Sequence, residues 1–206
     1  MKNSSLSTIS AVVLDVETTG FSPYYDEIIE LGMVLFTIGL PRIKITTIDQ
    51  YSGLRQPGCK IHPRASLVNG ITMSMVQGKS LDLERVESIL EQAQLIIAHN
   101  AAFDKSFTER LIPSVLGKPW YCSMRGIDWY GRGFYSKSLP YLLREHSIAV
   151  QRAHRAQDDA MACLKLISQR PSPDKPYILE MLSKKPLHLP REHHHTIKQI
   201  AAAIRA

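Results

Sequence analysis

The chain is predicted to fold as an α/β protein whose mixed sheet begins with an antiparallel meander and is flanked by helices. Three observations predict this class. Apolar, β-branched runs with short turns follow one another near the N-terminus, helical spacing alternates with short apolar runs farther on, and the composition is that of a globular protein. With 206 residues, 44% hydrophobic and 21% charged, the chain suffices for one full core and leaves little for a second domain.

The N-terminal part is predicted to form three consecutive strands. Residues 9–16 are short, apolar and β-branched, as in a central strand. Gly20 and Pro23 mark the next turn, and residues 27–38 and 42–51 are the second and third strands. Because only short turns join them, we expect these strands to pair antiparallel.

The following part is predicted to alternate helices with short buried strands. Helical spacing of apolar side chains identifies the helices, and short apolar runs identify the strands. Asn100 is a good N-cap residue for one of the helices. A meander followed by such units resembles a ribonuclease H-like sheet. The predicted elements are helices at 81–94, from 100 onward, 139–147 and 156–168, and strands at 95–98 and 121–123.

A change of composition at Pro171 divides the chain. Five prolines lie between Pro171 and Pro190, and basic residues outnumber acidic ones six to three from 171 to the end. We therefore expect a main domain at residues 1–170 and a proline-containing basic tail at 171–206, with a terminal helix from about 191 to 205.

Cysteine usage and hydropathy bear on location. Cys59, Cys122 and Cys163 are odd in number and scattered, so they form neither a disulfide framework nor a metal clip, and a reducing, cytoplasmic setting is predicted. We find no signal-peptide pattern and no apolar stretch near the ~20 residues of a membrane span, so no membrane partner is expected.

The charge is unevenly distributed along the chain. The net charge is +6, but residues 1–104 carry −3 whereas residues 105–156 carry +6. A solvated basic surface would have the same composition. Beside an acidic site, however, a basic half suits a polyanionic substrate.

Acidic side chains stand at the ends of predicted elements. Asp15 and Glu17 are two apart on the first strand, so both point to one face. Asp104 lies one turn into the helix that follows Asn100. With a fourth acid from the last core helix, these acids would converge and repel one another unless cations lay between them. Carboxylates are the ligands of hard cations such as Mg²⁺. The residues therefore point to metal-assisted phosphodiester chemistry.

The last core helix supplies the fourth acid. Asp158 and Asp159 both fall in its first turn, and Asp159 shares a face with core-type residues whereas Asp158 leans toward solvent. His154 precedes the helix. A histidine in a loop is usually an ordinary surface residue, but beside a metal it is a candidate general base. Alternatives stay open for two of the acids as well. Glu17 could simply cap the turn or be solvated there, and Asp104 could simply be a first-turn acid that interacts favourably with the helix dipole.

Three segments resemble the three motifs of the DEDDh 3′–5′ exonucleases, which include the proofreading epsilon subunit of bacterial DNA polymerase III and ribonuclease T. The segments are DVETTG at 15–20, HNAAFD at 99–104 and HRAQDD at 154–159. Secondary resemblances lie at 27–32, 69–72, 119–123 and 138–143, and the likeness covers about residues 10–168. On this resemblance, residues 1–170 are expected to be an exonuclease domain.

The resemblance implies roles for particular residues. Asp15, Glu17, Asp104 and Asp159 would bind two divalent cations, Mg²⁺ or Mn²⁺, and His154 would deprotonate the attacking water. Substrate contacts are implied for four further residues. The family usually has leucine where this chain has Phe21, which we interpret as a hydrophobic wedge against terminal bases. The implied contact residues are Thr18, Phe21, Ile71 and Asn100.

The expected function is removal of nucleotides from the 3′ ends of single-stranded or frayed DNA, with release of nucleoside 5′-monophosphates. The polarity comes from the resemblance alone. Three alternatives stay open: an exoribonuclease of the ribonuclease T or oligoribonuclease type, a proofreading subunit that docks on a DNA polymerase, and a nucleic-acid-binding module without turnover. The oligomeric state is left open.

Overall fold

A five-stranded mixed sheet forms the centre of the protein in the computed structural model, which describes residues 8–40, 43–150, 154–171, 175–194, 197–198, 200 and 202. The strand order is β3-β2-β1-β4-β5. Strands β1, β2 and β3 pair antiparallel, and β4 and β5 continue the sheet in parallel with β1. The predicted fold class and its antiparallel meander are confirmed. The strands are β1 (Thr8–Thr18), β2 (Ile28–Gly39), β3 (Lys44–Leu54), β4 (Leu95–Ala98) and β5 (Trp120–Cys122).

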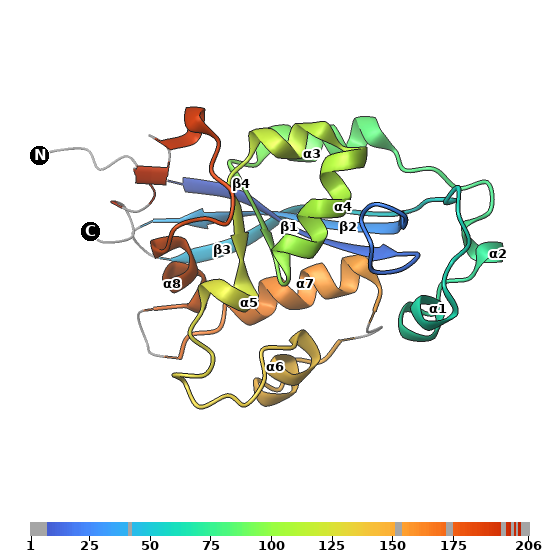
Figure 1. The fold of residues 1–206 in the computed structure, drawn as a ribbon. Helices are drawn as coiled ribbons and strands as arrows, with labels where there is room; N and C mark the ends of the chain where they lie inside the picture. The colour runs from blue at the N-terminus through green and yellow to red at the C-terminus, as the bar shows by residue number, and fades with distance from the viewer. Residues whose placement is uncertain are drawn as a thin grey trace, which may run out of the picture.

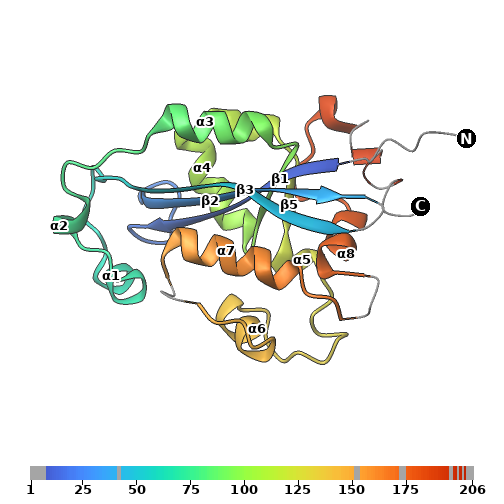
Figure 2. The ribbon, with the colours of Figure 1, turned by 180° about the vertical axis from the view of Figure 1, so that it is seen from behind.

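Helices cover both faces of the sheet (Figures 1 and 2). Helices α3 and α4 lie on one face, and α7 lies on the other with α6 outside it, while α1 and α2 lie beyond one end of the sheet. The helices are α1 (Pro63–Asn69), α2 (Met73–Val76), α3 (Leu83–Gln92), α4 (Ala101–Leu111), α5 (Ser123–Gly126), α6 (Leu139–Glu145), α7 (Ala156–Ile167) and α8 (Tyr177–Ser183), with short 3-10 turns η1 (Pro113–Gly117) and η2 (Arg191–His193).

Alternation along β1 decides which side chains face which helices. Val12 and Leu14 pack in the cluster that includes α3 and α4 residues, whereas Ala11 and Val13 pack in the cluster that includes α6, α7 and α8. Asp15 continues the second series. The acids of β1 therefore leave the sheet on the side that α7 covers.

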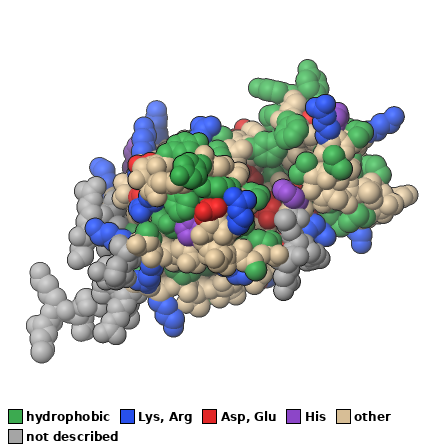
Figure 3. Space-filling model, turned by 90° about the horizontal axis from the view of Figure 1, so that it is seen from below, with side chains coloured by type: hydrophobic (Ala, Val, Ile, Leu, Met, Phe, Trp, Pro, Cys, Tyr) green, Lys and Arg blue, Asp and Glu red, His purple; other side chains and the backbone are tan. Residues whose placement is uncertain are grey.

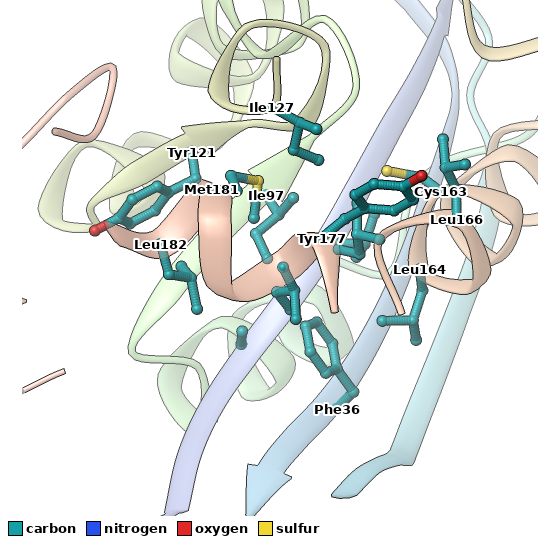
Figure 4. Packing of buried hydrophobic residues seen from close by; sticks show 14 of the residues in the cluster. Phe36, Ile97, Tyr121, Ile127, Cys163, Leu164, Leu166, Tyr177, Met181 and Leu182 are labelled. Carbon is teal, nitrogen blue, oxygen red and sulfur yellow. The ribbon is translucent and has the colours of Figure 1, made fainter. Parts of the chain in front are cut away.

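Helix α8 belongs to the same core, although it lies in the segment expected to be a tail. Tyr177, Ile178 and Met181 are buried beside Phe36 of β2 and Ile97 of β4 (Figure 4). The helix is short and almost wholly apolar, so it has no helical period to read, and prolines flank it. The boundary at residue 170 stays a prediction, but the packed structure continues beyond it.

Element ends differ from expectation where side chains set them. The helix expected at 81–94 begins at Leu83 because the carboxylate of Asp82 accepts the backbone N–H of Arg85 at 2.9 Å. The third strand extends to Leu54, and Arg42 lies outside the described residues. Helices α1, α2, α5 and α8 were not predicted. Of the terminal helix expected at 191–205, η2 covers the start, and residues 195, 196, 199, 201 and 203–205 lie outside the described part.

Two further findings concern the cysteines and the lengths of the helices. Cys59, Cys122 and Cys163 are free thiols. Among the residues that the structure describes, no helix has the length and apolar character that a membrane crossing needs.

Candidate active site

A cavity of about 670 Å³ opens where β1 and β4 end. Figure 3 shows acidic and histidine side chains together near the middle of one face, among hydrophobic side chains. All five expected catalytic residues line this cavity, together with an apolar wall from α4, α6 and the segment after α6. The lining residues are Asp15, Val16, Glu17, His99, Asn100, Phe103, Asp104, Leu139, Pro140, Leu143, Arg144, Ile148, Val150, His154 and Asp159.

Strand β1 supplies Asp15 and Glu17. Burial raises the pKa of Asp15 well above its usual range, and the neighbouring Asp104 and Glu17 raise it further. Burial likewise raises the pKa of Glu17 to about 8, against a hydrogen bond from Asn69 that lowers it. The two groups therefore take up protons readily unless a positive charge compensates for them.

Helix α4 supplies Asp104 from its first turn. Its side chain is buried at 3% exposure, and this burial raises the pKa of Asp104 to about 7 although backbone hydrogen bonds, including one from Val16, lower it. Asn100 occupies the N-cap position as predicted, but its side chain makes no capping hydrogen bond. Asn100 instead lines the cavity.

Helix α7 and the residue before it supply Asp159 and His154. One carboxylate oxygen of Asp159 accepts the backbone N–H of His154 at 3.1 Å. His154 has φ +61°, a left-handed conformation that is uncommon for residues other than glycine and that concentrates at functional sites. Burial raises the pKa of Asp159, which the proximity of His154 partly offsets. The neighbouring Asp158 lines a separate small cavity instead.

The arrangement fits a divalent cation. Ligand atoms of Glu17, His154 and Asp159 lie within 4.8 Å of one another. Asp15 and Asp104 border the same cavity, and their mutual repulsion is among the causes of the raised pKa of Asp15. Carboxylate oxygens are the ligands that Mg²⁺ and Mn²⁺ prefer, and a cation would offset the repulsion that the buried acids suffer.

The comparisons with known proteins agree with this geometry. Residues 12–167 match the model of the RNase_T family, described as an exonuclease. The chain belongs to this exonuclease family. Its expected ribonuclease H-like fold is confirmed by the solved structure of exonuclease X in complex with 5′ overhanging duplex DNA, which is 26% identical, with a TM-score of 0.57, over 76% of this chain and 89% of that one.

Relatives of the exonuclease domain occur in DNA polymerases. The chain is 34% identical to a DNA polymerase III PolC-type from Thermotoga petrophila over 77% of its own length, but it spans only 12% of that protein. It is 30% identical to DNA polymerase III subunit epsilon of Treponema pallidum, over 78% of this chain and 75% of the relative. Exonuclease I of E. coli with a dT13 oligonucleotide has a similar fold, with 18% identity and a TM-score of 0.61 over 77% of this chain and 40% of that one.

The residues expected to contact substrate in the exonuclease domain are not all brought to the cavity. Asn100 lines it. The hydroxyl of Thr18 donates to the Gly20 carbonyl at 2.6 Å within the turn, and the side chain is buried. Ile71 is fully buried against Ile29, so its side chain does not reach the cavity. Phe21 lies outside the cavity lining and is 78% exposed, and its role as a wedge stays a prediction.

Asn69 supports the site of the exonuclease domain, a role that was not predicted from the sequence. Its side chain is buried, hydrogen-bonds Glu17 and accepts the Ile71 N–H at 2.9 Å. Gly70 follows with φ +69° and ends α1, a conformation that suits glycine. The Asn-Gly pair was a signal for such a turn, but its contact with Glu17 depends on the fold.

His99 is a second residue with a supporting position. Its Nε2 atom lies 2.7 Å from the Lys137 carbonyl and its Nδ1 atom 2.8 Å from the Ser123 hydroxyl. Burial lowers the pKa of His99 to about 4. The neutral ring therefore links the start of α4 to the segment before α6.

Proposed function

We propose that the exonuclease domain removes nucleotides from the 3′ ends of single-stranded or frayed DNA by metal-assisted hydrolysis and releases nucleoside 5′-monophosphates. The observation that carries the proposal is the single cavity that unites Asp15, Glu17, Asp104, Asp159 and His154. Each of the four acids has a raised pKa, and a histidine lies beside them. Such a group of residues suits phosphodiester hydrolysis better than a passive binding role.

The four acids would hold two divalent cations, Mg²⁺ or Mn²⁺. Bound there, such cations stabilise negative charge on the attacking and leaving oxygens. His154 would accept the proton of the attacking water as that water bonds to phosphorus. The bond from phosphorus to the 3′ oxygen of the preceding nucleotide then breaks, and that oxygen gains a proton. The nucleotide leaves with its 5′ phosphate.

The apolar wall would hold the terminal nucleotide. Phe103 of α4 and Leu139 and Leu143 of α6 line the same cavity as the acids. Such side chains can contact a base or sugar, because base faces stack on apolar and aromatic surfaces regardless of sequence. Asn100 would donate its amide hydrogens to a phosphate oxygen. Arg144 borders the same cavity and would add positive charge near the phosphate.

Two comparisons favour DNA over RNA as the substrate. Exonuclease X, which is 26% identical to this chain, was solved in complex with DNA, and the sequence relatives are parts of DNA polymerases. RNA is the alternative, and the difference rests on contacts to the 2′-hydroxyl. The same relatives favour a second candidate function, proofreading as part of a DNA polymerase assembly. We further propose a cytoplasmic location, on the three free cysteines.

The test uses matched DNA and RNA oligonucleotides that carry a label at the 5′ end. With Mg²⁺, we expect a ladder of DNA products that shorten from the 3′ end, nucleoside 5′-monophosphates as the released species, and no products in EDTA. The pair of substitutions Asp15→Ala and Asp104→Ala should abolish cleavage, whereas Glu84→Gln on the exposed surface of α3 serves as the matched acidic control. Immediate release of the labelled nucleotide, or full activity of the double variant, would contradict the proposal.

The proofreading candidate is tested with primers annealed to a template. A proofreading role predicts that a mismatched primer end is removed faster than a paired one, and that the protein co-purifies with a DNA polymerase. Equal rates on both ends and no polymerase in the purified complex would leave the free exonuclease as the function.

A further inference from the structure

The turn after β1 presents aromatic rings to solvent. Tyr24 is 82% exposed and Tyr25 is 84% exposed. The turn beneath them is closed by hydrogen bonds: the carboxylate of Asp26 accepts the Thr19 hydroxyl and the Ser22 N–H, both at 2.9 Å. The two rings therefore project from an ordered turn into solvent. Packing in the core does not account for aromatic side chains at these positions.

A second, smaller cavity lies beside these rings. It has a volume of about 230 Å³ and is formed between the turn, the start of β2, the end of β3 and helix α4. We call it the aromatic groove. Its lining residues are Tyr24, Tyr25, Asp26, Glu27, Ile28, Arg55, Phe107, Arg110 and Leu111.

One face of α4 connects the aromatic groove to the main cavity. Phe103 lines the main cavity, and Phe107, one turn farther along the helix, lines the groove. Their ring centroids lie 4.8 Å apart. Arg110 follows on the same face, at the i+3 position after Phe107. A chain that leaves the main cavity along α4 therefore meets the groove next.

The guanidinium of Arg110 is the positive charge of the groove that a phosphate can reach. Glu27 is paired with Arg55 at 2.6 Å and also accepts the Gly58 N–H at 3.1 Å. Asp26 is held by the hydrogen bonds of the turn. Arg110 is exposed, and its positive charge is the last of the causes that lower the pKa of Glu27. A neighbouring small cavity shares Arg55 and adds Lys79, which extends the basic border.

We infer that the aromatic groove binds the nucleotides that precede the 3′-terminal one, with bases on Tyr24 and Tyr25 and a phosphate on Arg110. This inference rests on the proposed function, since the terminal nucleotide must occupy the main cavity. Exposed aromatic rings accept any base, and a guanidinium matches a phosphate, so the groove recognises single-stranded nucleic acid without regard to sequence.

The test compares a substrate that reaches only the main cavity with one that reaches both. The first is the p-nitrophenyl ester of thymidine 5′-monophosphate, and the second is a long single-stranded oligonucleotide. For the double variant Tyr24→Ala, Tyr25→Ala, we expect the ratio of kcat/KM for oligonucleotide over ester to fall about tenfold or more. Arg110→Gln should lower the same ratio and reduce the salt dependence of oligonucleotide binding by about one phosphate contact.

Tyr135→Ala is the matched control, because Tyr135 is 91% exposed but lies on the loop before α6, outside the groove. It should leave the ratio as in the parent. An unchanged ratio in the Tyr24, Tyr25 variant would overturn the inference and would favour a protein partner for these rings. Equal losses on both substrates would also overturn it, because they would indicate damage to the main cavity.

Binding measured without turnover separates this inference from the proposed function. Fluorescence anisotropy of a labelled oligonucleotide in EDTA measures strand binding without hydrolysis, and the difference between the parent and the Tyr24, Tyr25 variant gives the contribution of the groove. If the parent protein hydrolyses nothing but binds the strand through Tyr24 and Tyr25, the proposed function fails and the groove stands. If hydrolysis proceeds and binding ignores both tyrosines, the groove fails and the proposed function stands.

Discussion

Glu30 of β2 and Arg155, the residue before α7, form an ion pair at the start of that helix. The guanidinium of Arg155 contacts both carboxylate oxygens of Glu30 at 2.6–3.1 Å, and Glu30 also accepts the Ala156 N–H at 3.0 Å. The side chain of Glu30 is 1% exposed. Glu30 stands opposite Glu17 in the register of β1 and β2. The pair thus ties the helix that carries Asp159 to the strand beside Glu17.

Replacement of Glu30 by glutamine should destabilise the protein by about 3 kcal/mol, since it leaves a partly buried guanidinium without its carboxylate. It should also reduce exonuclease activity, because the start of α7 loses an anchor. Urea unfolding and kcat/KM on an oligonucleotide measure the two effects. Glu84→Gln on exposed α3 is the control. Stability and activity like those of the parent would show that the pair does not position the helix.

Gly32 allows α7 to approach the sheet. A Cβ at Gly32 would overlap the backbone of Ala156 and Gln157, and Gly32 stands opposite Asp15 in the strand register. Gly32→Ala should therefore destabilise the protein by about 1–3 kcal/mol and displace the acids of β1 and α7 relative to each other. Gly117→Ala is the matched control, because its Cβ would meet open space. A change below about 0.5 kcal/mol with normal activity would contradict this role.

Asn69 should act through Glu17. Asn69→Ala removes a hydrogen bond to the Glu17 carboxylate and leaves the Ile71 N–H without its acceptor. Loss of such a supporting contact typically costs about 10–100-fold in metal affinity or activity. Activity measured across a Mg²⁺ titration should therefore show a higher half-saturating concentration than in Gln77→Ala, a control on the exposed surface after α2. An unshifted titration would assign Asn69 to the turn alone.

Because His99 is buried, the free energy of unfolding should depend on pH. The pKa of His99 is lowered to about 4 by burial, below its ordinary value of 6.5 in an unfolded chain. The neutral ring therefore contributes stability that is present above about pH 6.5 and is lost as pH falls toward 4, by about 3 kcal/mol in total. NMR titration of the ring should give a midpoint near pH 4. A midpoint near 6.5 would show that the ring is not buried as described.

Local patterns in the sequence predicted much of the candidate site. Alternation along a strand correctly put Asp15 and Glu17 on one face, and helical spacing correctly favoured Asp159 over Asp158 as the residue that borders the cavity. Asp104 also lies where a first helical turn would put it. These placements depend on backbone geometry within one element, which the sequence encodes directly.

The rest depends on contacts between elements. The burial of Ile71 depends on Ile29 of β2, and the hydrogen bond of Asn69 to the Thr18 carbonyl arises only when the end of α1 lies beside the end of β1. The core position of α8 depends on Phe36 and Ile97, which are far away in sequence. The backbone of His154 adopts a left-handed conformation, which few non-glycine residues adopt and which the local sequence does not mark. Periodicity contains no information on such contacts.

The central claim is that the four acids form one site for divalent cations. Electron paramagnetic resonance of Mn²⁺ titrated into the purified protein counts the bound ions directly. The parent protein and Glu84→Gln should bind two Mn²⁺ ions per chain, and the double variant Asp15→Asn, Asp104→Asn should lose at least one of them. The same number and affinity of ions in all three proteins would contradict the claim.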